Sequence, residues 1–233
     1  MKLVVGLGNP GSEYKNTRHN IGYMYLDYLF GTDFTLNNKF MAMEKEVYVN
    51  NEKIMIIKPT TYMNLSGEAV LKYVNYYKIG IDDILIIQDD LDMDIGSYKL
   101  MYNHGDGGHN GIKNIILNLS SKCFLRLKIG ISKDKTIDTK NYVLGKFDKT
   151  EIDKLNNVFL NLKDFISDFE EMNREKLIGK YNTMNNNKWG ILWSYLIIYL
   201  ILMIMMIIVY LVLIMNLLVL IYMMLLLEII KAF

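Results

Sequence analysis

Several residue types that supply chemistry or shape the backbone are scarce in this 233-residue chain. A single cysteine, Cys123, excludes an internal disulfide and fits a reducing compartment, so we expect a cytoplasmic protein. The three histidines and that cysteine show no fixed ligand spacing, and the sequence therefore predicts neither a metal site nor another cofactor. Only two prolines occur, Pro10 and Pro59, and both lie in polar segments that we interpret as loops.

An excess of charge of one sign is also lacking. The 26 basic and 25 acidic residues leave a net charge of +1, so nucleic-acid binding would need a local basic patch. The apolar run near the start, Leu3–Val5, is far too short for a signal peptide.

Charged residues are missing altogether from residues 189–227. As one helix, these 39 residues would be about 58 Å long, whereas a bilayer core is about 30 Å thick. Their composition is that of a membrane anchor, although Lys188 and Lys231 are the only basic residues that flank them. It also fits translation of AT-rich coding sequence outside its frame. We therefore expect a domain over residues 1–187 and an apolar tail over 188–233, either dispensable, non-native sequence or a membrane anchor.

Short apolar runs and helical patterns alternate along the first 187 residues, which predicts an α/β fold. The run Ile84–Ile87 is apolar throughout, as is typical of a central strand buried on both faces. A hairpin around Asn50 and Asn51 indicates that the twisted sheet, flanked by helices, is mixed rather than purely parallel. Strands are expected at residues 3–5, 46–50, 53–58, 84–87, 98–101 and 125–131, and helices at 21–30, 70–80, 112–119 and 152–169, with a short helix ending at residue 181.

Two finer expectations concern the last part of this domain. Thr150, with Asp153 three residues later, resembles a capping box at the start of the helix over residues 152–169, whose apolar residues recur every three or four positions. The polar residues 133–141 are expected to form a loop.

The loop over residues 6–20 is the most informative segment of the chain. Its glycines match the G-x-G-x-x-G fingerprint of dinucleotide-binding proteins. However, Pro10 removes an N–H where a helix N-terminus should meet the pyrophosphate, and the helical pattern begins only near His19. No strand ending in an acidic residue follows at the distance that a ribose ligand requires. We therefore reject a nucleotide site.

Two side chains in loops are suited to proton transfer. His19 ends the glycine-rich loop, and an imidazole is the usual general base, although a lone histidine there would also suit capping or packing. Asp89 ends the central strand, where a carboxylate can orient a histidine and stabilise its charged form, although aspartate also favours turns.

Two asparagines, Asn64 and Asn110, stand where loops lead into predicted helices. Asparagine is a common helix cap, but its amide can also hold an ester carbonyl, a water or a ribose hydroxyl at any pH. The segment from His104 to His109 is rich in glycine, which lets a backbone or phosphate approach closely, and we do not interpret it as a metal site.

Together, in this order and spacing, these motifs resemble the bacterial-type peptidyl-tRNA hydrolase family. The resemblance runs from Met1 to about Asn182 and is carried by residues 5–11, 14, 17–22, 58–67, 89–92, 107–111, 126–131 and 142–147. It implies a single α/β domain and a monomeric, metal-independent enzyme whose substrate is peptidyl-tRNA. The implied reaction is hydrolysis of the ester between the peptide and the 3′ end of tRNA, which recycles tRNA for translation.

The resemblance also implies roles for particular residues. His19 matches the catalytic base and Asp89 its partner. The positions that match substrate-binding amides are Asn9, Asn64 and Asn110, and those that line the site and receive the 3′ end are Tyr14 and Met63.

The sequence departs from the family pattern beside the glycine-rich segment. Asn103, His104 and Asp106 replace small residues, and Met101 stands where a basic residue is common. A phosphate clamp for tRNA would then depend on Lys128, with help from Lys99, Lys113 or Arg126. Two alternatives stay open: a non-catalytic tRNA- or ribosome-binding module on the same fold, and a membrane-tethered protein defined by its tail.

Overall fold

Seven strands form one mixed sheet in the part of the chain that the computed structural model describes, which is residues 1–186, 197–208, 210, 214–216, 218, 220–221 and 223–224. The four central strands are parallel, and the three outer ones run antiparallel to their neighbours. This confirms the expected α/β fold. The order across the sheet is β2 (Thr35–Asn37), β3 (Ala42–Val49), β4 (Glu52–Pro59), β1 (Lys2–Gly6), β5 (Ile84–Asp90), β7 (Leu125–Gly130) and β6 (Tyr98–Tyr102).

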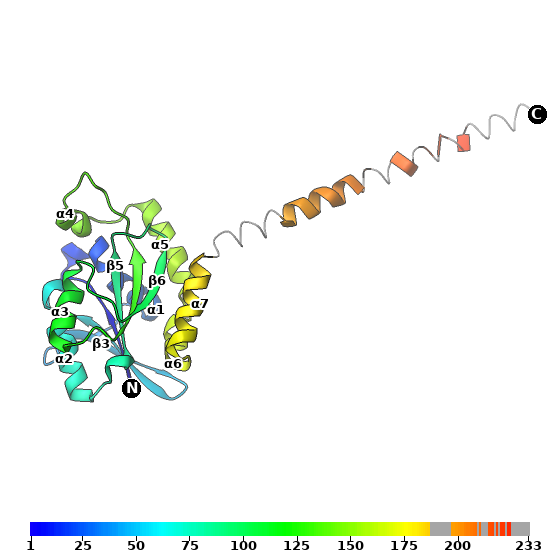
Figure 1. Cartoon of the computed structure of the whole chain (residues 1–233). Helices are drawn as coiled ribbons and strands as arrows, with labels where there is room; N and C mark the ends of the chain where they lie inside the picture. The colour runs from blue at the N-terminus through cyan, green and yellow to red at the C-terminus, as the bar shows by residue number, and fades with distance from the viewer. Residues whose placement is uncertain are drawn as a thin grey trace, which may run out of the picture. The chain divides into compact units, whose positions relative to one another are not determined.

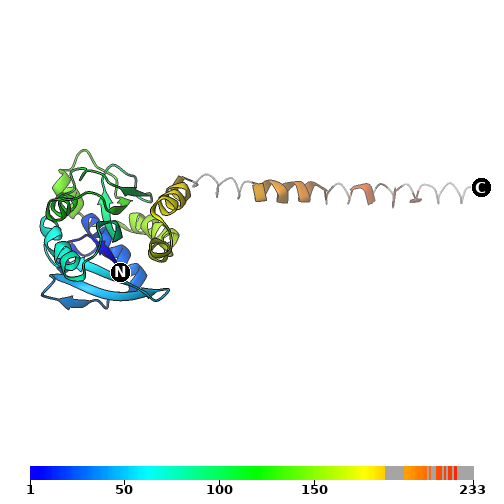
Figure 2. The ribbon, with the colours of Figure 1, turned by 60° about the horizontal axis from the view of Figure 1, so that its bottom comes forward.

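Helices cover both faces of the sheet, as Figures 1 and 2 show. One face packs against α1 (Ile21–Phe30), α5 (Lys149–Asn161), α6 (Phe165–Glu171) and α7 (Arg174–Asn186), and the other against α2 (Ser66–Tyr77) and α3 (Asn110–Leu119). Each face therefore has its own apolar core. The alternation of side chains along β5 illustrates this, because Leu85 and Ile87 lie in the first core while Ile84 and Ile86 lie in the second.

Short elements complete the domain. The loops contain the 3₁₀ turns η1 (Ser12–Tyr14), η2 (Arg18–Asn20), η3 (Met63–Leu65) and η4 (Ile81–Asp83), and the short helix α4 (Thr139–Leu144). The predicted hairpin joins β3 to β4 through Asn50 and Asn51, which both have positive φ, at 50° and 67°. That conformation suits asparagine and the twist of a two-residue hairpin.

Helix α7 is hydrogen-bonded to the edge strand β6. The Asn182 side chain accepts from the Leu100 N–H at 2.8 Å and donates to the Leu100 carbonyl at 3.0 Å, while Asn185 accepts from the Tyr98 N–H at 3.2 Å. Leu177 and Tyr181 of the same helix are buried. The helix thus belongs to the folded core rather than to the tail.

Three local predictions are wrong. The capping box uses Asp148 and Glu151, which exchange two 2.8 Å bonds between side chain and backbone, rather than Thr150 and Asp153. The expected single helix over residues 152–169 is interrupted near Leu162, whose carbonyl accepts from the Tyr25 hydroxyl at 2.7 Å. The end of the expected loop over 133–141 is the start of α4, because Asp138 caps that helix.

The chain divides into two compact units, Met1–Asn185 and Asn186–Phe233. None of the described helices is long and apolar enough to cross a membrane. The expectation of an anchor or a dispensable tail concerns residues 188–233, most of which lie outside the described residues.

Candidate active site

The candidate site lies at the carboxyl ends of β1 and β5, where polar side chains follow two adjacent parallel strands. Helix α1 begins very close to both strands. A Cβ added to Gly22 would lie 2.4 Å from the Leu7 nitrogen and 2.6 Å from the Ile87 carbonyl oxygen, so only glycine allows this approach. The close contact brings His19, three residues before Gly22, to Asp89 at the end of β5.

Asp89 accepts hydrogen bonds from two histidines through a single oxygen. Its Oδ1 lies 2.8 Å from His19 Nδ1 and 3.0 Å from His109 Nε2. The other nitrogen of His109, Nδ1, accepts from the backbone N–H groups of Gly111 and Ile112 at the start of α3. Because Nδ1 accepts these two bonds, Nε2 is the ring nitrogen that donates to Asp89 in this arrangement.

Electrostatics favour an ionised Asp89 and a basic His19. Burial alone raises the pKa of Asp89, but the two histidines outweigh it and hold that pKa well below its usual range. Burial lowers the pKa of His19, whereas the charge of Asp89 and the hydrogen bond to it raise it, and the net pKa lies above the ordinary 6.5. With Nδ1–H donated to Asp89, neutral His19 has its lone pair on Nε2.

The residues on either side of His19 fix its backbone. Arg18 makes two 2.9 Å bonds to the carboxylate of Glu151, and its guanidinium lies 4.4 Å from the Tyr142 ring centre. Asn20 is buried, and its side chain bonds both the N–H and the carbonyl of Asn9 at 2.9 Å. The imidazole therefore projects from a segment that is anchored at both ends.

Asn9 joins two of the loops around the site. Its Oδ1 accepts from the Met63 N–H at 2.8 Å, which orients the amide so that Nδ2 remains a donor with no hydrogen-bond partner among the described residues. Met63 is buried, and a Cβ on Gly111 would lie 2.7 Å from its sulfur. The loops that follow β1, β4 and β6 thus converge at Met63.

Asn64 and Asn110 flank this convergence, and both are exposed. The capping interpretation is wrong for each of them. His109 caps α3, with Asn110 as its first helical residue, and α2 has no side-chain cap. Both amides are therefore accessible to a ligand.

Tyr14 and the basic residues lie around the site in different environments. Tyr14 is half-buried, and its ring meets exposed Tyr62 edge-on with centres 6.4 Å apart. Lys99 and Lys113 are exposed. Lys128 forms an ion pair with Asp90, and Arg126 is 3% exposed with no partner for its Nε.

His109 is the residue that sequence reasoning missed. From the sequence we weigh His109 only as a metal ligand and reject that interpretation, whereas it is both the N-cap of α3 and a partner of Asp89. The available signal was its position directly before a predicted helix, which is where a side-chain acceptor is needed.

The cluster of His19, Asp89 and His109 contains three potential metal ligands within 4.8 Å of one another. The two nitrogen–oxygen distances, 2.8 and 3.0 Å, are those of hydrogen bonds and are shorter than the separation of about 3.3 Å between neighbouring ligands of a tetrahedral zinc ion. His104 is exposed and lies outside the cluster. The absence of a metal requirement stays a prediction.

Comparisons with known proteins agree on one family. A family model described as peptidyl-tRNA hydrolase matches residues 3–189. The chain is 41% identical over 191 residues to a peptidyl-tRNA hydrolase of Clostridium botulinum, covering 81% of this chain and 99% of the relative. A Listeria welshimeri peptidyl-tRNA hydrolase is 40% identical over 184 residues, covering 78% and 100%.

Solved structures of the same name share the fold. The crystal structure of peptidyl-tRNA hydrolase from Acinetobacter baumannii is 31% identical with a TM-score of 0.72, over 78% of this chain and 94% of that one. A crystal structure of a peptidyl-tRNA hydrolase complex with N-propanol gives 32% identity and a TM-score of 0.72, over 79% and 94%.

Proposed function

Because the chain belongs to the peptidyl-tRNA hydrolase family and is therefore a hydrolase, we propose that it cleaves the ester between peptide and tRNA, with His19 as general base and Asp89 as its orienting partner. The observation that supports this mechanism is the 2.8 Å bond from His19 Nδ1 to Asp89. It leaves Nε2 unprotonated at the edge of the site.

In the proposed reaction, a water molecule attacks the ester carbonyl carbon and gives a proton to His19 Nε2. The new carbon–oxygen bond forms, and the bond from the carbonyl carbon to the ribose oxygen then breaks. The imidazolium returns the proton to that ribose oxygen, which leaves as the hydroxyl of free tRNA. Asp89 remains ionised and stabilises the imidazolium. An ester has a good leaving group, so no covalent nucleophile is needed.

The amides complete the proposed site. Asn9 Nδ2 is a donor of fixed orientation, which suits it to the oxygen that becomes negative in the transition state. Asn64 is a second candidate for that role, and Asn110 is suited to holding the water or the peptide, because both are exposed beside the converging loops. Tyr14 and Met63 would line the place of the tRNA 3′ end.

The tRNA backbone would lie over the basic residues of β6, β7 and α3. Lys99 and Lys113 are exposed, whereas Lys128 must exchange its ion pair with Asp90 for a phosphate. Removing one such contact should weaken tRNA binding and lower the slope of log affinity against log salt by about one.

The test is hydrolysis of N-acetyl-aminoacyl-tRNA by the full chain and by its His19→Ala variant, with His104→Ala as the matched control because His104 is exposed outside the cluster. We expect tRNA release that survives EDTA, falls about 10²–10⁴-fold in His19→Ala and is unchanged in His104→Ala. Binding without release would instead identify a non-catalytic module, and full activity in His19→Ala would overturn the mechanism.

A further inference from the structure

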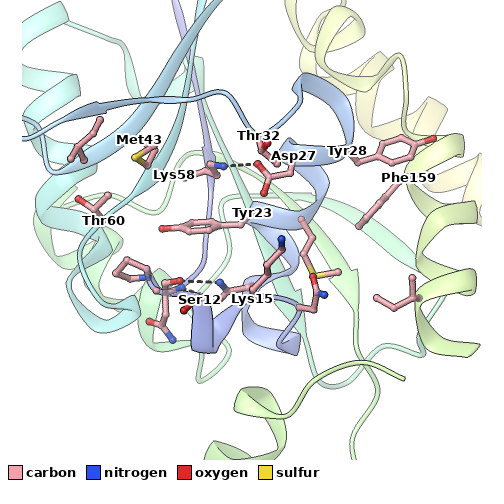
Figure 3. Close-up of a pocket in the computed structure, with 18 of the residues that line it drawn as sticks. Ser12, Lys15, Tyr23, Asp27, Tyr28, Thr32, Met43, Lys58, Thr60 and Phe159 are labelled. Carbon is pink, nitrogen blue, oxygen red and sulfur yellow. Dashed lines mark hydrogen bonds and ion pairs between the residues drawn. The ribbon is translucent and has the colours of Figure 1, made fainter. Parts of the chain in front are cut away.

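A cavity lies beside the proposed catalytic residues, between α1, α5 and the β2–β4 side of the sheet. Its volume is about 980 Å³, at the upper end of the usual range for ligand sites. Asn9 and Asn20 line it, whereas His19, Met63, Asn64 and Asn110 do not. Figure 3 shows the Tyr23 ring crossing this cavity, with Asp27 and Lys58 on one side of the ring and Ser12 and Lys15 on the other.

The charges of this cavity do not suit a polyanion. Lys58 is buried, forms an ion pair with Asp27, and lies 3.9 Å from the Phe34 ring centre. Lys15 is the remaining cation of the lining and makes no ion pair with the described residues. One uncompensated charge offers a weak site for a nucleic-acid backbone, which is recognised by several cations together.

The remaining lining has the chemistry of a peptide-binding site. Side-chain amides and hydroxyls can pair with the N–H and C=O groups of a peptide, and apolar walls can take its side chains. The polar members include Asn16, Asn38 and Asn156, and the apolar ones include Tyr28, Leu36 and Phe159. Tyr28 is 46% exposed and Leu36 51% exposed, so apolar surface is open to a ligand there.

The topology places this cavity and the basic residues on opposite sides of Asp89. Strand β5 separates β1–β4 from β7 and β6 in the sheet. Arg126 and Lys128 alternate along β7 with Leu127, which lies in the core beneath α1, so they project from the other face. An ester held at His19 would therefore have its tRNA on one side and its peptide directed to the other.

We propose that this cavity, which we call the α1–α5 pocket, binds the peptide part of peptidyl-tRNA beyond the residue that is esterified to tRNA. The proposal rests on the proposed function. Asn20 connects His19 to the α1–α5 pocket, because it follows His19 in the chain, lines the pocket and is hydrogen-bonded to both backbone polar groups of Asn9.

The experiment compares two substrates on the full chain: N-acetyl-aminoacyl-tRNA, and tRNA esterified with an N-acetylated pentapeptide of uncharged, mainly apolar residues. Tyr28→Ser and Leu36→Ser, singly and together, remove apolar pocket surface. Leu160→Ser and Tyr48→Ser are matched controls, because these side chains are 55% and 65% exposed and lie outside the pocket. Because Tyr28 also packs on Phe159, Tyr28→Ser can destabilise the fold as well as remove pocket surface. The single Leu36→Ser variant keeps that contact and therefore tests the pocket surface separately.

The wild type should have a lower KM for the pentapeptide substrate than for the short one. The double variant should lose that preference, with kcat/KM for the pentapeptide substrate falling about tenfold and hydrolysis of the short substrate unchanged. Equal KM values in the wild type, or equal losses on both substrates, would overturn the proposal. If the wild type hydrolysed neither substrate, that result would instead contradict the proposed function. Binding of pentapeptidyl-tRNA would then test the pocket by itself, and the double variant should bind it more weakly than the wild type.

Discussion

At the scale of single residues, one carboxylate oxygen organises the candidate site. Asp89 Oδ1 accepts from His19 and from His109, and His109 in turn caps α3. The sequence identified His19 and Asp89 because each ends a loop or strand in a recognisable motif. It did not identify the shared oxygen, since 70 residues separate His19 from Asp89 and 20 separate Asp89 from His109.

The pH dependence of hydrolysis should follow the raised pKa of His19. The base acts only when it is neutral, so kcat/KM should rise with pH and reach half its plateau above pH 6.5. Asp89→Asn removes the charge that raises this pKa and leaves the burial that lowers it. We therefore expect the half-maximal point to move to lower pH, with a plateau lower by about 10²–10⁴-fold.

Exposed Asp92, also near the end of β5, supplies the control for this measurement. Asp92→Asn removes a nearby charge without touching His19 and should leave the profile in place. A half-maximal point that stays fixed in Asp89→Asn would show that the ionisation of another group controls the rate.

At the scale of elements, six of the seven strands in the described residues were predictable, whereas the short edge strand β2 and several helix ends were not. Central strands can be predicted from continuous apolar runs, as at Ile84–Ile87, because they are buried on both faces. The break near Leu162 depends on the Tyr25 hydroxyl, 137 residues away, so no local pattern contains it. The capping box was ambiguous locally, since Asp148 with Glu151 and Thr150 with Asp153 both fit the motif.

The contact of α1 with the ends of β1 and β5 can be tested at Gly22. In Gly22→Ala the new methyl group would meet backbone atoms of Leu7 and Ile87, which cannot give way independently. We expect destabilisation by about 1–3 kcal/mol or more, and a loss of kcat because the displaced helix moves His19 from Asp89.

Gly179 offers the matched control for this substitution. It lies inside α7, and a Cβ there would meet nothing within 4 Å. Gly179→Ala should therefore raise the free energy of unfolding by about 0.5–1 kcal/mol and leave kcat unchanged. Urea unfolding and single-turnover kinetics measure both effects, and equal stability of the two variants would contradict the close contact.

At the scale of the whole molecule, we expect the first compact unit, Met1–Asn185, to fold independently of the tail. The first unit, Met1–Asn185, includes both apolar cores and all the proposed site residues. The length and composition of the chain suggested this division, because charged residues stop at position 188 and resume only at 228.

A chain that ends after residue 187 should therefore fold and hydrolyse N-acetyl-aminoacyl-tRNA with a kcat/KM within about twofold of the full chain. Circular dichroism melting and the hydrolysis assay provide the comparison. An unfolded or inactive product, beside an active full chain, would show that residues 188–233 are required.

The attachment of α7 to β6 also hinders association of this edge strand with other molecules of the same protein. An edge strand with unsatisfied N–H and C=O groups is a template on which a strand of another molecule can add, and repetition of that step gives a fibre. Asn182 occupies both polar groups of Leu100, and Asn185 occupies the N–H of Tyr98. Side chains of one helix thus replace the missing neighbour strand along this edge, and polymerisation through β6 would first have to detach α7.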